Sequence, residues 1–267
     1  MLTISFCCFD GIGPQAEQKI WQHDLLSWQA VTQASSVACL SAKKLKYLQD
    51  QISQARHPLG GGVYDYFLNR FSPPQRPRLY PHIRKNLLYI DIETTGLRPD
   101  DTIVSVATYN GADIRWYVQG INMEQLITPL AHAPCLVTFN GSAFDLPRLR
   151  KHFNLNLSQP HLDLLPISRA HGLTGSLHQV ATLLSIQTPE DCKSTDIPHL
   201  WAQWTHGSCS QSLRELLIHN ACDVLLLEQI LRRLYERDLR CFPAPIRIGI
   251  ARQPCPEILA KAFFDNL

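Results

Sequence analysis

The stretch of sequence that decides the fold is Leu87-Leu88-Tyr89-Ile90-Asp91-Ile92-Glu93-Thr94-Thr95-Gly96-Leu97. It begins with four apolar residues, as expected of a central strand buried on both faces. Side chains two positions apart in a strand share a face, so Asp91 and Glu93 point the same way while Ile92 points into the core. Adjacent carboxylates raise each other's pKa unless a cation lies between them, and Mg²⁺ and Mn²⁺ take oxygen ligands. A solvated strand end is the alternative for a bare D-x-E, but the apolar run and the T-T-G turn favour a metal site.

Two further acidic segments follow along the chain. The segment Phe139-Asn140-Gly141-Ser142-Ala143-Phe144-Asp145 comes after another apolar strand and leads into a helix. An aspartate that only caps this helix is the alternative interpretation of Asp145. The segment His219-Asn220-Ala221-Cys222-Asp223-Val224 lies in a helical stretch, where residues four apart share one face. Such a His–Asp pair is common on helix surfaces. The third segment therefore indicates a functional site only in combination with the other two segments.

The pattern around these segments predicts a mixed sheet. We predict strands at residues 87–90, 103–109, 114–118, 135–139 and 162–165, and helices at about 123–131 and 146–153. Asn110-Gly111 is a strong hairpin signal between the second and third strands. The remainder is predicted to be mostly helical through about Arg240, with a loop at 189–198. Three antiparallel strands followed by alternating helices and strands indicate an α/β fold with a mixed five-stranded sheet and flanking helices.

A small, mostly helical region precedes this sheet. We predict a short buried strand within residues 2–9, then one helix that carries Ile20 and Trp28 on one face and a second from Ser41 to about Arg56. Residues 72–78 are rich in proline and arginine and are predicted to form an extended linker. The predicted domains are therefore an accessory region at 1–78, a domain built on the mixed sheet at 79–240 and a C-terminal tail at 241–267.

The composition indicates a globular protein but does not identify a ligand. The 267 residues are 45% hydrophobic and 18% charged, which excludes disorder for most of the chain. Residues 1–86 contain ten Lys or Arg and five Asp or Glu, a balance of +5, which leaves −3 for the rest of the +2 total. This asymmetry suits a phosphate backbone held over a metal site, although ordinary surface variation explains it equally well. The basic residues that precede the first acidic segment would either track phosphates or lie in a solvated linker: Arg76, Arg78, Arg84 and Lys85.

Cysteine usage and hydropathy predict a cytoplasmic protein with no membrane partner. The nine cysteines form no C-x-x-C pair, and their odd number and irregular spacing predict reduced thiols rather than a disulfide framework. No apolar run approaches transmembrane length.

Taken in order, the three acidic segments resemble the motifs of the DEDD superfamily of 3′–5′ exonucleases. D-I-E-T-T-G-L resembles the first motif, N-G-S-A-F-D the second and H-N-A-C-D-V the third, over roughly residues 87–235. The chain most resembles the bacterial YprB-like ribonuclease-H-like branch. Further similarities to that branch are Gly11-Ile12-Gly13, Trp21, Trp28, His161-Leu162-Asp163-Leu164 and Gly175-Ser176-Leu177.

The resemblance implies a ribonuclease-H-like fold and a metal-dependent 3′–5′ exonuclease that hydrolyses phosphodiester bonds. Its substrate would be a single-stranded nucleic acid with a free 3′ end, with DNA in a repair setting favoured. An RNA exonuclease and a catalytically weak binding or scaffold protein remain as alternatives. The N-terminal region would either dock a helicase or guide the strand.

The resemblance also assigns roles to individual residues. It places two divalent cations, Mg²⁺ or Mn²⁺, on Asp91, Glu93, Asp145 and Asp223. It places the substrate on Thr94, Thr95, Asn140 and Phe144, although packing on the core is favoured over base stacking for the Phe144 ring. Asp163 is an additional acid near the sheet, for which a supporting role is expected.

One position departs from the family pattern. The family carries histidine five residues before its last acid, or tyrosine four residues before it, whereas here Ile218 and His219 occupy those positions. An imidazole accepts a proton from water near neutral pH better than a phenol, whose reference pKa is ~10. We therefore predict that His219 is the general base or orients the water, with a partly degenerate site as the alternative.

Overall fold

A computed structural model describes residues 1–188 and 196–243 of the chain. Within this part, the chain divides into two compact units. One contains residues 1–83 and the residues from Leu234 onward, and the other contains residues 84–233. Parts of the predicted loop at 189–198 and of the predicted tail at 241–267 lie outside the described residues.

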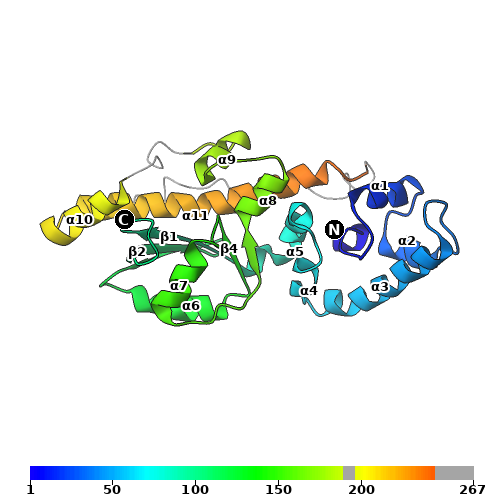
Figure 1. Cartoon of the computed structure of the whole chain (residues 1–267), viewed down its shortest axis with the longest axis horizontal. Coiled ribbons are helices and arrows are strands. Elements are labelled where there is room, and N and C mark those ends of the chain that lie inside the picture. Colours follow the sequence, from blue (N-terminus) through cyan, green and yellow to red (C-terminus); the bar gives the residue numbers. More distant parts are fainter. Residues whose placement is uncertain (189–195, 244–267) are drawn as a thin grey trace. The chain divides into compact units, whose positions relative to one another are not determined.

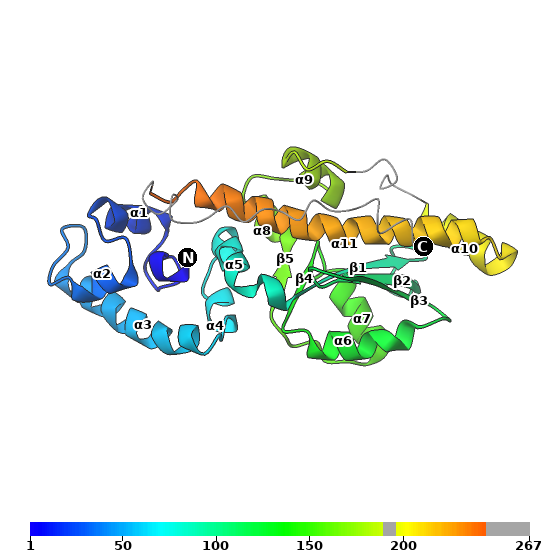
Figure 2. The same ribbon diagram turned by 180° about the vertical axis from the view of Figure 1, so that it is seen from behind.

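The larger unit is built on a five-stranded sheet in the order β3-β2-β1-β4-β5 (Figure 1, with all five strands labelled in Figure 2). Its strands are β1 Leu87–Thr94, β2 Ile103–Tyr109, β3 Ile114–Val118, β4 Cys135–Thr138 and β5 His161–Asp163. The pairs β1–β2 and β2–β3 are antiparallel, whereas β1–β4 and β4–β5 are parallel. The predicted mixed sheet is confirmed. The last strand is shorter than predicted because the Asp163 side chain accepts a hydrogen bond from Leu165 N and caps the next helix.

Helices cover both faces of this sheet (Figures 1 and 2). The helices that follow the first three strands are α6 Ile127–His132, after the 3₁₀ turn Met123–Leu126, then α7 Asp145–Phe153, α8 Leu164–Ala170, α9 Leu177–Leu183, α10 Ile197–Gly207 and α11 Ser210–Leu239. Ile90 and Ile92 of β1 pack in one core with residues of α6 and α7. The opposite face lies under α11, where Trp116 Nε1 donates to Leu217 O at 2.8 Å. The alternation along β1 therefore directs Ile90 and Ile92 to α6 and α7 and the two acids toward α11.

The smaller unit is mostly helical, as predicted. Its elements are the 3₁₀ turn Leu2–Ile4, α1 Pro14–Gln22, α2 Trp28–Gln33, α3 Ala42–Gly60, α4 Asp65–Leu68, the 3₁₀ helix Pro73–Leu79 and α5 Tyr80–Ile83, with the last residues of α11. A further 3₁₀ turn, Arg84–Asn86, begins the larger unit. Ser41 caps α3 by accepting a hydrogen bond from Lys44 N, as expected.

Three local predictions in this unit are wrong. Residues 2–9 do not form a strand, because the Glu17 carboxylate accepts hydrogen bonds from the backbone N–H groups of Phe6 and Cys7. The single predicted helix is two helices, since Asp24 adopts φ 61° after α1 and Ser27 caps α2. Helix α3 continues past Pro58 to Gly60, because a proline in the last turn removes only one backbone hydrogen bond.

The predicted linker at 72–78 is instead a 3₁₀ helix that contributes to the core. Its Arg78 side chain is buried between two buried acids of the same unit. Its Nη1 lies 2.8 Å from Glu17 Oε2, and its Nε lies 2.6 Å from Asp238 Oδ2. Arg78 therefore forms ion pairs with two buried acids and is not available to track phosphates.

The described residues also bear on the cysteine and membrane predictions. Six cysteines are free thiols: Cys7, Cys8, Cys39, Cys135, Cys209 and Cys241. Cys222 is disulfide-bonded, so the prediction of reduced thiols is wrong for that residue. None of the helices in the described ranges combines the length and apolar character that a membrane crossing requires.

We expect the substitution Arg78→Ala to lower the free energy of unfolding by about 3–5 kcal/mol, because it leaves two buried carboxylates without their cation. Urea denaturation measures this value. The matched control is Lys46→Ala, which breaks the exposed pair with Asp50 and should cost less than about 1 kcal/mol. Equal small losses in both variants would contradict the importance of the buried charges.

Candidate metal-binding site

Three acids from two elements converge on the α11 face of the sheet. Asp91 and Glu93 come from β1, and Asp223 comes from α11. One carboxylate oxygen from each lies within 4.8 Å of the others. This spacing allows one cation to contact all three groups. Strand alternation brings the first two acids to one face, and helix packing on the sheet brings the third to them.

A buried amide fixes the position of Asp91. Asn220 Nδ2 donates to Asp91 O at 3.1 Å and to Asp91 Oδ2 at 2.8 Å. Its Oδ1 accepts a hydrogen bond from Ser105 Oγ at 2.8 Å. Both Asn220 and Ser105 are fully buried, so their polar atoms need these partners. The sequence prediction gave Asn220 no role, although it lies inside the third acidic segment.

Asp145 lies beside the three-acid group rather than within it. It is the first residue of α7 and is buried. The loop before it depends on Asn140, at φ 64°, and on Gly141, where a Cβ would lie 2.0 Å from Thr138 Oγ1. Asp163 holds the same loop, since its oxygens accept from Asn140 N and Ser142 N. Asp163 thus has the supporting role expected of it.

A cavity of about 340 Å³ adjoins these acids. Its walls include Asp91 and Asp145, the aromatic rings of Phe139 and Phe144, and Arg169. Residues Gly175, Ser176 and Leu177, which precede or begin α9, complete one side of it. The cavity therefore presents two carboxylates, apolar surface and one cationic side chain to a ligand.

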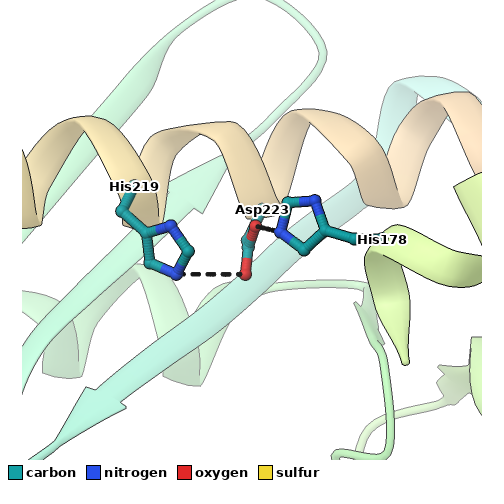
Figure 3. A group of neighbouring side chains, drawn as sticks. All are labelled: His178, His219 and Asp223. Atoms are coloured by element: carbon teal, nitrogen blue, oxygen red, sulfur yellow. Dashed lines mark ion pairs between the residues drawn. The ribbon is translucent and has the colours of Figure 1, made fainter. Parts of the chain in front are cut away.

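Two histidines flank Asp223 (Figure 3). His219, one turn earlier on α11, places its Nε2 3.5 Å from Glu93 Oε1 and 3.9 Å from Asp223 Oδ2. His178, from α9, places its Nε2 3.0 Å from Asp223 Oδ1. The two imidazole rings lie nearly parallel, with centroids 6.1 Å apart. The sequence prediction missed His178, although the Ser176…Gln179 capping pattern signals a helix start with His178 in its first turn.

Burial and nearby negative charges raise the pKa values of Asp91, Glu93 and Asp145. Burial is the largest cause for each of these three acids. The pKa of Asp91 lies well above its usual range, with Asp223 and Glu93 adding to the effect. The pKa of Glu93 rises to about 8, with Asp223 and Asp145 contributing. Burial and the charge of Asp163 raise the pKa of Asp145 to about 7. The hydrogen bond to Asp223 raises the pKa of His178.

The four residues predicted to bind substrate separate into two pairs. Asn140 and Phe144 line the cavity, and the Arg148 guanidinium covers the Phe144 ring at 3.7 Å. Thr94 and Thr95 are not among the cavity's lining residues. The Thr94 hydroxyl donates to Gly96 O, and the Thr95 hydroxyl accepts from Thr102 N, so both side chains hold the turn after β1.

Comparison with known proteins agrees with this architecture. The family described as the RNase H superfamily matches residues 88–235, which is more than half of the chain. The chain belongs to the RNase H superfamily. The matched region contains the sheet apart from Leu87, the acids and both histidines. No curated protein matches the chain.

Membership of the RNase H superfamily indicates a nuclease-type function with a nucleic-acid substrate. The donors present fit the divalent cations that such nucleases use. Carboxylate oxygens are the ligands that Mg²⁺ and Mn²⁺ take. Buried acids with raised pKa values are stabilised in their charged form by a cation between them. The residues of the acid group are therefore suited to hold a metal ion.

We expect the metal-free protein to lose stability as the pH rises through about 7 and about 8, the pKa values of Asp145 and Glu93. Both folded-state values exceed the unfolded ones, so the protonated acids stabilise the fold at low pH and this contribution disappears as they ionise. His178, whose pKa is also raised, changes stability in the same direction.

Thermal unfolding in EDTA between pH 6 and pH 9 measures this dependence. Glu93→Gln should flatten it, and Mg²⁺ or Mn²⁺ should oppose it in the wild type. The control is the exposed Glu124, whose change to glutamine should leave the slope unaltered. Equal slopes in wild type and Glu93→Gln would show that the ionisation of Glu93 does not cause the loss of stability at high pH.

Proposed function

We propose that this RNase H superfamily protein is a two-metal-ion 3′–5′ exonuclease of the DEDD type, within the YprB-like branch. The observation that carries the proposal is the convergence of Asp91, Glu93 and Asp223 within 4.8 Å, with Asp145 beside them. The order of the three acidic segments supports the same conclusion. The proposed domain is residues 79–240, with 1–78 as an accessory region and 241–267 as a tail.

In this proposal the four acids Asp91, Glu93, Asp145 and Asp223 hold two Mg²⁺ or Mn²⁺ ions. The ions would supply Lewis acidity, which lowers the pKa of the attacking water and stabilises the leaving 3′ oxygen. Asn220 keeps Asp91 in place through two hydrogen bonds. Asp163 keeps the loop before Asp145 in place.

His219 is the proposed general base or water-orienting residue. Its Nε2 is 3.5 Å from Glu93 Oε1 and 3.9 Å from Asp223 Oδ2, so a water bound near these acids lies within reach of the imidazole. The ring is largely buried, which restricts its motion. Four residues before Asp223, it takes the place that tyrosine has in one class of these exonucleases.

The proposed substrate is single-stranded nucleic acid with a free 3′ end, with DNA repair in the cytoplasm favoured. The cavity supports this proposal because it joins the acids Asp91 and Asp145 to the apolar rings of Phe139 and Phe144. An aromatic ring stacks on a base irrespective of sequence, and the Arg169 side chain offers a cation to a phosphate. Docking of a helicase and guidance of the strand are the two proposed roles of the accessory region.

We expect the protein, with Mg²⁺ or Mn²⁺, to shorten a single-stranded DNA oligonucleotide from its 3′ end. A 5′-labelled strand should give a ladder, and a 3′-labelled strand should release a labelled mononucleotide at once. Asp91→Asn should abolish both products, because it removes the charge that binds the cation. Absence of cleavage by the wild type, or equal cleavage by the variant, would refute the proposal; preferred cleavage of RNA would change the substrate.

We expect His219→Ala to lower kcat by about 10²- to 10⁴-fold, the usual contribution of a general base, with little change in KM. His219→Tyr should retain part of the activity, since it restores the residue found at this spacing in the tyrosine class. Steady-state kinetics across pH 6–9 measure both effects. His206, exposed on α10, provides a control substitution to alanine, and unchanged kcat in His219→Ala would exclude the role.

A further inference from the structure

The two oxygens of Asp223 face different partners. Oδ1 lies 3.0 Å from His178 Nε2, and Oδ2 lies 3.9 Å from His219 Nε2. The His219 ring in turn approaches Glu93 at 3.5 Å, on the side of the other acids. A carboxylate only accepts hydrogen bonds, so a hydrogen bond across this 3.0 Å separation requires that His178 carry its proton on Nε2. Oδ2 is the oxygen that lies on the side of His219.

We propose that His178 is a positioning residue of the metal site, which donates its Nε2–H to Asp223 Oδ1 and so keeps Oδ2 directed to the cation. This inference rests on the proposed function of the acid group. It gives α9, which lies outside the three acidic segments, a role in metal binding.

Repulsion within the acid group is the physical reason that Asp223 needs such a partner. Its side chain is 13% exposed, and it faces Asp91 and Glu93 across less than 4.8 Å. A carboxylate that rotates freely about its side-chain bonds would turn away from two like charges. A hydrogen bond from His178 to Oδ1 opposes this rotation before a cation arrives. Partners of this kind orient metal ligands and commonly change metal affinity by about 10–100-fold when they are removed.

His178 is itself held by the start of α9. Ser176 Oγ accepts from Gln179 N, and Gln179 Oε1 accepts from Ser176 N at 2.8 Å, which closes a capping box around the first turn. Gly175 leaves space for the Gln179 side chain of this capping box. Its φ is +124°, and a Cβ there would lie 2.5 Å from Gln179 Oε1 and 2.8 Å from Gln179 Cβ. The position of His178 thus depends on a glycine three residues earlier.

The test is Mn²⁺ binding to the full chain, measured by calorimetry and by the electron paramagnetic resonance of free Mn²⁺. We expect His178→Ala to weaken binding by about 10–100-fold and to lower kcat on a single-stranded oligonucleotide, with little change in KM. His178→Gln should restore most of the affinity, because its amide also donates a hydrogen bond. Leu183→Ala, at the exposed end of α9, is the matched control and should bind like the wild type.

A second variant changes the position of His178 without changing its side chain. Gly175→Ala should displace the capping box and weaken Mn²⁺ binding in the same direction, while His178 and Asp223 both remain. Thermal unfolding of each variant identifies any that does not fold, and the conclusion then rests on the others.

Three outcomes would overturn the inference. The first is Mn²⁺ affinity equal to wild type in His178→Ala and Gly175→Ala, which would leave the proposed exonuclease intact. The second is failure of His178→Gln to restore affinity in a folded protein. The third is a nitrogen coupling to bound Mn²⁺ that disappears in His178→Gln, since this would make His178 a ligand. A wild type that neither binds Mn²⁺ nor cleaves DNA would instead overturn the proposed function itself.

Discussion

The site depends on one constraint, the repulsion between carboxylates that the fold brings together on one face of β1. Burial removes the water that would screen these charges and raises the pKa values of Asp91, Glu93 and Asp145. Acids under such repulsion separate unless their backbone and their hydrogen-bond partners hold them. The central strand holds Asp91 and Glu93, the start of α7 holds Asp145, and α11 holds Asp223.

The packing of α11 on the sheet and the geometry of the site arise from the same contacts. Asn220 joins Ser105 of β2 to Asp91 of β1, and Asp223 follows one turn later. A polar pair buried under a helix is costly when it is unsatisfied, and here each hydrogen bond also fixes a residue of the acid group. Changes in how α11 lies on the sheet would therefore move Asp223 and His219 together.

In the smaller unit, the buried acids are paired with a cationic side chain. Glu17 and Asp238 are buried, and the Arg78 guanidinium lies between them. Each of these acids therefore has a cationic partner within the protein. In the candidate metal-binding site, the acids face imidazoles and an amide, which orient them without supplying a permanent positive charge. This contrast distinguishes charges that stabilise a fold from charges arranged for a ligand.

Strand alternation and turn chemistry are local properties, so β1 with its two acids and the hairpin between β2 and β3 could be predicted from the sequence. The order of the three acidic segments could be read from it directly. The sequence also singled out Asn140 and Gly141 by the segment that contains them. Tertiary structure alone decided that Asp145 stands beside the other acids, that His178 meets Asp223 and that Arg78 is a core residue rather than part of a linker. These contacts join residues from 45 to 160 positions apart. Such pairs depend on how the helices pack, and helix packing cannot be predicted from periodicity in the sequence.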